Sequence, residues 1–294
     1  MEGSSQASFP LLKRAERDHD RSIGRFLRTR AARRTRHVLR MLTAVDSFYS
    51  TAKGIVYPGL RYGFRWTIEG LHHVERSGPA ILASNHISYL DPLTLAYVAN
   101  RRGRRVRFLA KAELFDKRIL GSLLRGMQQI PVQRGHTDAA AALDAAVDAL
   151  SAGECVAVFP EGTISLDLNP MVGRSGTVRL AARCGIPVTP VGLWGSHRII
   201  PKGRKPRWRW GIAQVAVVGP PLRIEADEHV RDATDRVMAA ICACVARARE
   251  IYPQHPENVD AWWAPRPETA ILRSCRPDKS DADVEEDGVS RRRK

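Results

Sequence analysis

The chain has 294 residues, of which 44% are hydrophobic, and 47 lysines and arginines against 31 acids give it a formal net charge of +16. This apolar content excludes a chain that is disordered throughout, and the length allows one large α/β domain with appendages or two small domains. The charge indicates an anionic partner (nucleic acid, an anionic membrane or a phosphorylated substrate) or else only a soluble basic surface.

The N-terminal part of the chain is basic and then aromatic. We expect residues 1–20 to be flexible. Residues 21–45 carry many arginines and no acid, with apolar residues at roughly helical spacing, and an aromatic-rich stretch follows as far as Trp66. This pattern favours an amphipathic helix on an anionic lipid surface, over a helix packed on the body or an RNA-binding arm. We therefore predict a membrane-associating helical segment over residues 21–65.

Between residues 66 and 252, apolar runs alternate with helix-like segments. This alternation predicts an α/β domain with a largely parallel sheet covered by helices. Residues 253–294 are predicted to form a C-terminal extension whose charged, apolar-poor end is disordered. The expected strands cover 79–84, 105–110, 129–133, 155–160, 187–194 and 214–219, and the expected helices end at Asn100 and Leu124 or cover 138–153, 176–185 and 227–251.

A histidine and an aspartate follow the first of these strands, in the stretch "NHISYLD". His86 would lie at the carboxyl end of the strand, where ligands bind in open α/β sheets. If the chain turns there, Asp91 can hold one imidazole nitrogen and leave the other free to take a proton from a hydroxyl. The competing interpretation makes Ser88 and Asp91 a capping box of the next helix and His86 an ordinary turn residue.

Other expected strand ends also carry polar or basic residues. Glu161, Gly162 and Thr163 follow one strand, and Gly162 would allow an oxygen-rich ligand to approach the backbone closely. Arg134 follows another, and an arginine can bind a phosphate through two hydrogen bonds. Because these ends belong to neighbouring elements of one predicted sheet, we expect them to share one cleft.

Four motifs in order give the chain a resemblance to a known family: "NHISYLD" (85–91), "GMQQIPVQR" (126–134), "FPEGT" (159–163) and "IPVTPV" (186–191). Over roughly residues 66–220 it resembles the glycerolipid acyltransferases, whose members include 1-acylglycerol-3-phosphate acyltransferases. One departure is Ile164, where many members of the family have an arginine.

The resemblance implies an enzyme of phospholipid biosynthesis at the membrane, a transferase. It would move a fatty acyl group from acyl-coenzyme A or acyl-carrier protein to the hydroxyl of 1-acylglycerol 3-phosphate, without a metal or cofactor. His86 would be the general base and Asp91 would orient it. The residues implied to bind substrate are Arg134, Glu161, Gly162, Thr163, Lys111 and Arg174.

Other functions stay open at this point. Ile164 leaves room for a different lyso-lipid acceptor. A nucleic-acid-binding protein is supported only by charge, since no RNA-recognition signature or zinc-finger spacing is present, and we expect no nucleic-acid partner. A lipid-ester hydrolase using Ser84 or Ser88 would lack the usual G-x-S-x-G turn.

Two further features concern the surface. The segment 201–211 mixes cations with tryptophans, and it either contacts lipid headgroups or coenzyme phosphates or forms a solvated hairpin. We expect His197, just before it, at the surface. No long apolar run clearly spans a bilayer, and the N-terminus lacks the apolar region of a secretory signal. We therefore expect a peripheral or monotopic protein on the cytoplasmic face of the cell membrane.

Overall fold

The computed structural model describes residues 51, 54, 56–132, 136–225, 227–256 and 261–264. The body considered below begins at Gly54. The basic segment expected over residues 21–45, the N-terminal 20 residues and the charged end of the chain lie outside the described residues. Within the described part, no helix combines the length and the apolar character needed to cross a membrane.

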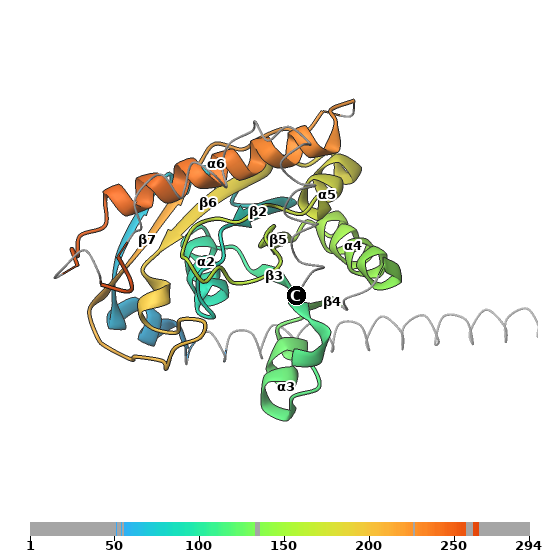
Figure 1. Ribbon diagram of the computed structural model, residues 1–294. Coiled ribbons are helices and arrows are strands. Elements are labelled where there is room, and N and C mark those ends of the chain that lie inside the picture. Colours follow the sequence, from blue (N-terminus) through green and yellow to red (C-terminus); the bar gives the residue numbers. More distant parts are fainter. Residues whose placement is uncertain are drawn as a thin grey trace, which may run out of the picture. The chain divides into compact units, whose positions relative to one another are not determined.

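A seven-stranded sheet forms the centre of this body, in the order β1-β7-β6-β2-β5-β3-β4 (Figure 1). The five strands from β6 to β4 run parallel to one another, whereas β7 is antiparallel to β6, and β1 is parallel to β7. The predicted α/β fold with a largely parallel sheet is confirmed. The strands are β1 (Phe64–Glu69), β2 (Ala80–Ser84), β3 (Val106–Lys111), β4 (Ile130–Val132), β5 (Cys155–Val158), β6 (Val188–Trp194) and β7 (Ile212–Val218).

Helices cover both faces of the sheet. Residues 56–63 are helical and lead into β1. The longer helices are α2 (Asp91–Asn100), α3 (Arg118–Gly126), α4 (His136–Ser151), α5 (Gly176–Cys184) and α6 (Val230–Glu250), and the short 3-10 helices are η1 (Leu71–His73), η2 (Ala112–Leu114) and η3 (Ser196–Arg198).

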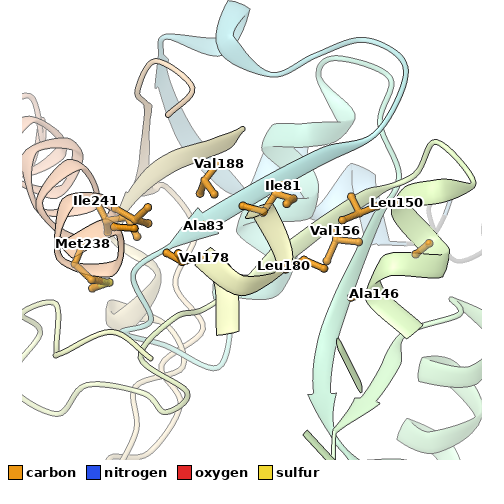
Figure 2. Packing of buried hydrophobic residues seen from close by; sticks show 14 of the residues in the cluster. Ile81, Ala83, Ala146, Leu150, Val156, Val178, Leu180, Val188, Met238 and Ile241 are labelled. Carbon is orange, nitrogen blue, oxygen red and sulfur yellow. The ribbon is translucent and has the colours of Figure 1, made fainter. Parts of the chain in front are cut away.

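The central strand β2 shows how the two faces are filled. Its residues alternate, so that Ile81 and Ala83 enter the apolar cluster beneath α4, α5 and α6, while Ala80 and Leu82 enter the cluster beneath α2. Figure 2 shows the first cluster, with side chains from three helices meeting β2. Because both faces are covered, the strand is buried throughout, and this explains its continuous apolar sequence.

The edge strand β1 was not predicted. Its sequence, FRWTIE, alternates apolar and polar residues, which is typical of a half-buried strand. Trp66 on this strand stacks on Tyr97 of α2 with 3.9 Å between ring centroids, and its Nε1 donates a hydrogen bond of 2.6 Å to the carbonyl oxygen of Leu60. Trp66 is thus partly buried and packs on the fold, and the interpretation of the aromatic stretch as a lipid boundary stays a prediction.

Candidate active site

The turn that carries His86 is fixed to the neighbouring strand through Asn85. The Asn85 side chain donates to the carbonyl oxygen of Leu193 (3.0 Å) and accepts from the Leu193 amide (2.7 Å), so it continues the pairing of β2 with β6 beyond the last strand residue. The chain then leaves the sheet, and α2 begins at Asp91 with a proline in its first turn. His86 thus lies at the carboxyl edge of the parallel strands, as predicted.

His86 and Asp91 are in direct contact. The Nδ1 atom of His86 lies 2.9 Å from Oδ2 of Asp91, whose side chain is fully buried, whereas that of His86 is 16% exposed. The same Oδ2 accepts the amides of Ile87 (2.6 Å) and Ser88 (2.7 Å), and Oδ1 accepts the hydroxyl of Ser196. A carboxylate that receives all these donors takes the Nδ1 hydrogen of the imidazole as well, which leaves Nε2 as the proton acceptor.

Ser88 and Asp91 do bind backbone amides at the start of α2, but they do not form the predicted capping box. The residue before α2 is Leu90, and it makes no side-chain capping bond. Instead, the Asp91 carboxylate turns back onto the preceding amides, while the Ser88 hydroxyl accepts the Leu90 amide (3.0 Å) and donates to the carbonyl oxygen of Ile200 (2.8 Å). The Asp91 carboxylate therefore both shapes the turn and holds the imidazole.

The two serines considered as nucleophiles do not suit that role. Ser84 and Ser88 are both fully buried, and each hydroxyl donates to a backbone carbonyl. A nucleophilic hydroxyl needs exposure to substrate and a neighbouring base. The hydrolase hypothesis thus finds no support at these positions.

Phe159 supports the imidazole from its face. Its ring is stacked on that of His86, with centroids 4.1 Å apart and an interplanar angle of 17°. Phe159 directly follows β5, which pairs with β2 so that Val158 lies opposite Ala83. The adjacent strand end thus brings the phenyl ring against the histidine, and the ring and Asp91 together restrict its orientation.

Glu161 is bound to the same turn. Its Oε1 accepts the backbone amide of His86 at 3.0 Å, and the residue is only 2% exposed. The pKa of Glu161 is raised to about 8, chiefly by burial and to a smaller extent by the nearby carboxylates of Asp91 and Asp167, against the opposing effect of the amides of His86 and Met171. Glu161 is therefore mostly protonated near neutral pH.

Gly162, Thr163 and Arg174 surround the same loop. Gly162 has a φ of +67°, and a Cβ atom there would lie 3.0 Å from Nε of Arg174, so the glycine allows the arginine to pack against the backbone. The Thr163 hydroxyl accepts a hydrogen bond of 3.1 Å from Nζ of Lys202. The structure thus brings these three predicted residues together next to Glu161 and the His86 turn.

Of the remaining predicted substrate-binding residues, Lys111 is not in contact with the histidine, and Arg134 cannot be placed. Lys111 is the last residue of β3 and is exposed, so it shares the carboxyl edge of the parallel sheet, but among the described residues it has no hydrogen bond or ion pair with His86 or Asp91. Arg134 lies outside the described residues. Its place in the cleft stays a prediction.

Sequence reasoning missed Ser196 and Lys202 and misplaced His197. Ser196 follows Gly195, whose φ of +108° marks a turn that only a glycine adopts readily, but nothing in the sequence pairs that turn with Asp91. The prediction that His197 is exposed is wrong, because it is fully buried beside Trp194, with Nε2 3.2 Å from the carbonyl oxygen of Trp263. Burial lowers the pKa of His197 to about 3.

Comparisons with known proteins agree with the motifs. Residues 65–194 match the sequence profile of the Acyltransferase family. The chain is 30% identical over 176 residues to the chloroplastic 1-acyl-sn-glycerol-3-phosphate acyltransferase LPAT1 of Arabidopsis thaliana, covering 59% of this chain and 48% of the relative. It is 26% identical over 171 residues to the 1-acyl-sn-glycerol-3-phosphate acyltransferase of Bacillus subtilis, covering 58% of this chain and 80% of that one. The chain thus spans about half the length of the plant relative.

The fold is also found in a solved structure. The crystal structure of the 1-acyl-sn-glycerophosphate acyltransferase PlsC from Thermotoga maritima superposes with a TM-score of 0.52 at 22% sequence identity, over 74% of this chain and 99% of the other. The motif turn with His86 and Asp91 and the FPEGT loop both lie inside the matched range 65–194. Over this range, the chain is similar to the acyltransferase family.

Proposed function

We propose that the chain is an O-acyltransferase that transfers a fatty acyl group from acyl-coenzyme A or acyl-carrier protein to the hydroxyl of 1-acylglycerol 3-phosphate, giving phosphatidic acid. The match to the family profile and the names of the relatives support the reaction class. The observation that carries the mechanism is the 2.9 Å contact between Nδ1 of His86 and Oδ2 of Asp91, because it presents Nε2 as a base in a partly exposed ring.

In this mechanism His86 acts as a general base. Nε2 takes the proton of the acceptor hydroxyl as the hydroxyl oxygen attacks the thioester carbonyl carbon. A C–O bond forms, the C–S bond breaks, and the proton passes from the imidazolium to the departing thiolate. The buried Asp91 carboxylate stabilises the transient imidazolium, and the mechanism requires no metal or cofactor.

The mechanism is tested by replacing the base. His86→Ala should lower kcat by about 10²- to 10⁴-fold, the usual contribution of a positioned general base, because the carboxylate of Asp91, the other base in the turn, is fully buried. Acyl transfer from acyl-coenzyme A to 1-acylglycerol 3-phosphate is followed by mass spectrometry, and folding by circular dichroism. His229→Ala, which removes an imidazole that is 73% exposed, is the control. Near-normal turnover by His86→Ala would refute the general-base mechanism.

A second candidate acceptor follows from Ile164. Its side chain is only 7% exposed, so this position contributes no charge where many members of the family carry an arginine. A lyso-lipid without the terminal phosphate is therefore the alternative acceptor. A panel of lysophosphatidic acid, glycerol 3-phosphate, other lysophospholipids and amino-acid lipids decides between them, and the proposed acceptor should give the highest kcat/KM.

We also propose that the protein works as a peripheral or monotopic protein at the cytoplasmic face of an anionic membrane. Its net charge of +16 favours such a surface. In the segment 201–211, Trp208 is 69% exposed and Trp210 is 83% exposed, and both lie among arginines. Exposed tryptophans between cations suit the headgroup region of a bilayer.

A further inference from the structure

The segment after η3 is fixed to the turn that carries His86. The carbonyl oxygen of Ile200 accepts the Tyr89 amide (3.2 Å) and the Ser88 hydroxyl (2.8 Å), and Pro201 forms a β-bridge with Ser88. Pro201 is buried, so the chain at this point is part of the wall of the site. The next residue, Lys202, is therefore held beside the catalytic turn.

Lys202 reaches across to the loop that follows β5. Its Nζ donates to the hydroxyl of Thr163 (3.1 Å) and to the carbonyl oxygen of Ile164 (2.9 Å). The same loop is bound to the histidine, because the Ser165 amide donates to the carbonyl oxygen of His86 at 2.8 Å. Lys202 thus binds Ile164, and the next residue of the loop, Ser165, contacts His86 directly.

The charge of Lys202 is not neutralised within the described part of the chain. No carboxylate there forms an ion pair with it, and its two acceptors are neutral oxygens. The nearby Asp167 carboxylate accepts instead the Ser165 hydroxyl (2.6 Å) and the Asn169 amide (3.1 Å). A half-buried ammonium without a counter-ion is unfavourable, and it has a third N–H for which these two contacts leave room.

We propose that Lys202 binds the phosphate monoester of the acceptor lipid and supplies the positive charge that position 164 lacks. The inference rests on the proposed acyltransferase function and identifies the residue that selects its acceptor. The buried Ile164 offers the ligand only backbone, and Lys202 brings a cation to that backbone. Arg174 packs against the same loop at Gly162, so two separate segments bring cations to this loop.

The acceptor is favoured over the phosphates of coenzyme A by the position of the cation. Lys202 holds the loop that binds the backbone of His86, both at Ser165 and through Oε1 of Glu161. A group bound there belongs to the molecule whose hydroxyl must reach Nε2 of His86. Kinetics can show whether Lys202 binds a phosphate of the acceptor or of acyl-coenzyme A, because each substrate has its own KM.

The test compares Lys202→Met and Lys202→Gln with Lys202→Arg. Methionine and glutamine remove the charge, while glutamine keeps an N–H donor for the loop and arginine keeps the charge. The control is Lys205→Met, which removes an exposed cation from the same segment. We expect both neutral variants to raise the KM for 1-acylglycerol 3-phosphate by about 10- to 100-fold, as expected for a lost charge-assisted hydrogen bond, with kcat within about threefold. Lys202→Arg should raise the KM for 1-acylglycerol 3-phosphate less than either neutral variant does, while Lys205→Met and the KM for acyl-coenzyme A should stay near the unmodified values.

An unchanged KM for the acceptor in the neutral variants, or a rise only in the KM for acyl-coenzyme A, would overturn the proposal. Calorimetric binding of glycerol 3-phosphate to the full chain separates this failure from that of the proposed function. If the unmodified protein has no transferase activity but binds glycerol 3-phosphate and Lys202→Gln does not, the acyltransfer proposal fails and the Lys202 site stands. If both bind equally, or neither binds, the Lys202 site is rejected.

Discussion

At the scale of single residues, the site is built around buried groups whose partners are mostly backbone amides. Asp91 and Glu161 are both almost fully buried, and both accept amides of the turn after β2. They differ in that Asp91 receives a hydroxyl and an imidazole as well, whereas burial dominates at Glu161 and raises its pKa to about 8. The two carboxyl groups are thus suited to different tasks, one to hold an imidazole and the other to remain neutral.

The raised pKa of Glu161 predicts a pH-dependent stability. Between its ordinary pKa of 4.5 and about 8, the folded chain keeps a proton that the unfolded chain has released. The stabilisation from this group is therefore complete below about pH 4.5 and is lost as the pH rises through about 8, with a slope of up to about 1.4 kcal/mol per pH unit. Glu161→Gln should remove that slope, so the variant gains stability relative to the unmodified chain as the pH rises from 5 to 8.

Urea unfolding of both proteins at pH 5, 6.5 and 8 measures this difference. Glutamine keeps a carbonyl oxygen for the His86 amide, so the comparison isolates the titration of the carboxyl group. Parallel stability curves over this range would show that Glu161 does not carry the proton.

The contact between His86 and Asp91 was predictable because the two residues are five positions apart in one turn. The residues that were missed are paired over long separations: Ser196 is 105 positions from Asp91, and Lys202 is 39 positions from Thr163. His197 was misplaced for the same reason, since the backbone group it contacts, at Trp263, is 66 residues away. Only the fold brings these partners together, so sequence spacing contains no sign of them.

At the scale of elements, strands that are buried on both faces were predicted well. Continuous apolar runs such as AILAS and CVAV are characteristic of central parallel strands, and β2 and β5 are found where they were expected. The strand β1 was missed because β7, its partner among the described strands, lies far along the chain, with Phe64 opposite Ile212. Its aromatic residues also suit a membrane boundary, so composition alone did not identify it as a strand.

The packing of α6 on β6 depends on Gly192. A Cβ atom at this position would lie 2.5 Å from the backbone oxygen of Cys244, inside the contact distance of any real side chain. The helix lies along the strand, as Figure 1 shows, and its apolar side chains fill the cluster that Figure 2 shows, so it cannot retreat without opening that cluster.

Gly192→Ala should therefore lower the free energy of unfolding by about 1–3 kcal/mol, as overpacking of a core does. Gly176→Ala is the matched control, because a Cβ atom at this first residue of α5 would meet nothing within 4 Å. The control should change stability by less than about 1 kcal/mol. Urea unfolding of the two variants measures both values. Equal stability would mean that α6 does not approach the strand as closely as the backbone indicates.

At the scale of the whole molecule, the sheet brings the residues of the candidate site together, and the positive net charge favours an anionic surface. The carboxyl ends of neighbouring parallel strands carry the His86 turn and the FPEGT loop, and the segment 201–211 begins at the same site with Lys202 and continues to two exposed tryptophans. An acceptor phosphate held at Lys202 would thus be bound at the start of a segment whose far end suits a headgroup layer. This arrangement fits an enzyme that takes its acceptor from a lipid surface.

The basic N-terminal segment leads to the last prediction. Residues 21–45 contain eight arginines and no acid, and each cation near an anionic surface contributes about 1 kcal/mol of binding. Removing residues 1–45 should weaken binding to vesicles that contain anionic lipid by at least tenfold, while transfer to a short-chain acceptor dissolved in water stays near its original rate.

Sedimentation with anionic and with zwitterionic vesicles measures the binding, at low and at high salt, since an electrostatic contact should weaken as salt screens it. A double variant, Trp208→Ala with Trp210→Ala, measures the contribution of the segment 201–211 separately. If the truncated chain sediments with anionic vesicles as the full chain does, and only the tryptophan variant is released, the membrane contact belongs to the body of the protein and the role predicted for the N-terminal segment is wrong.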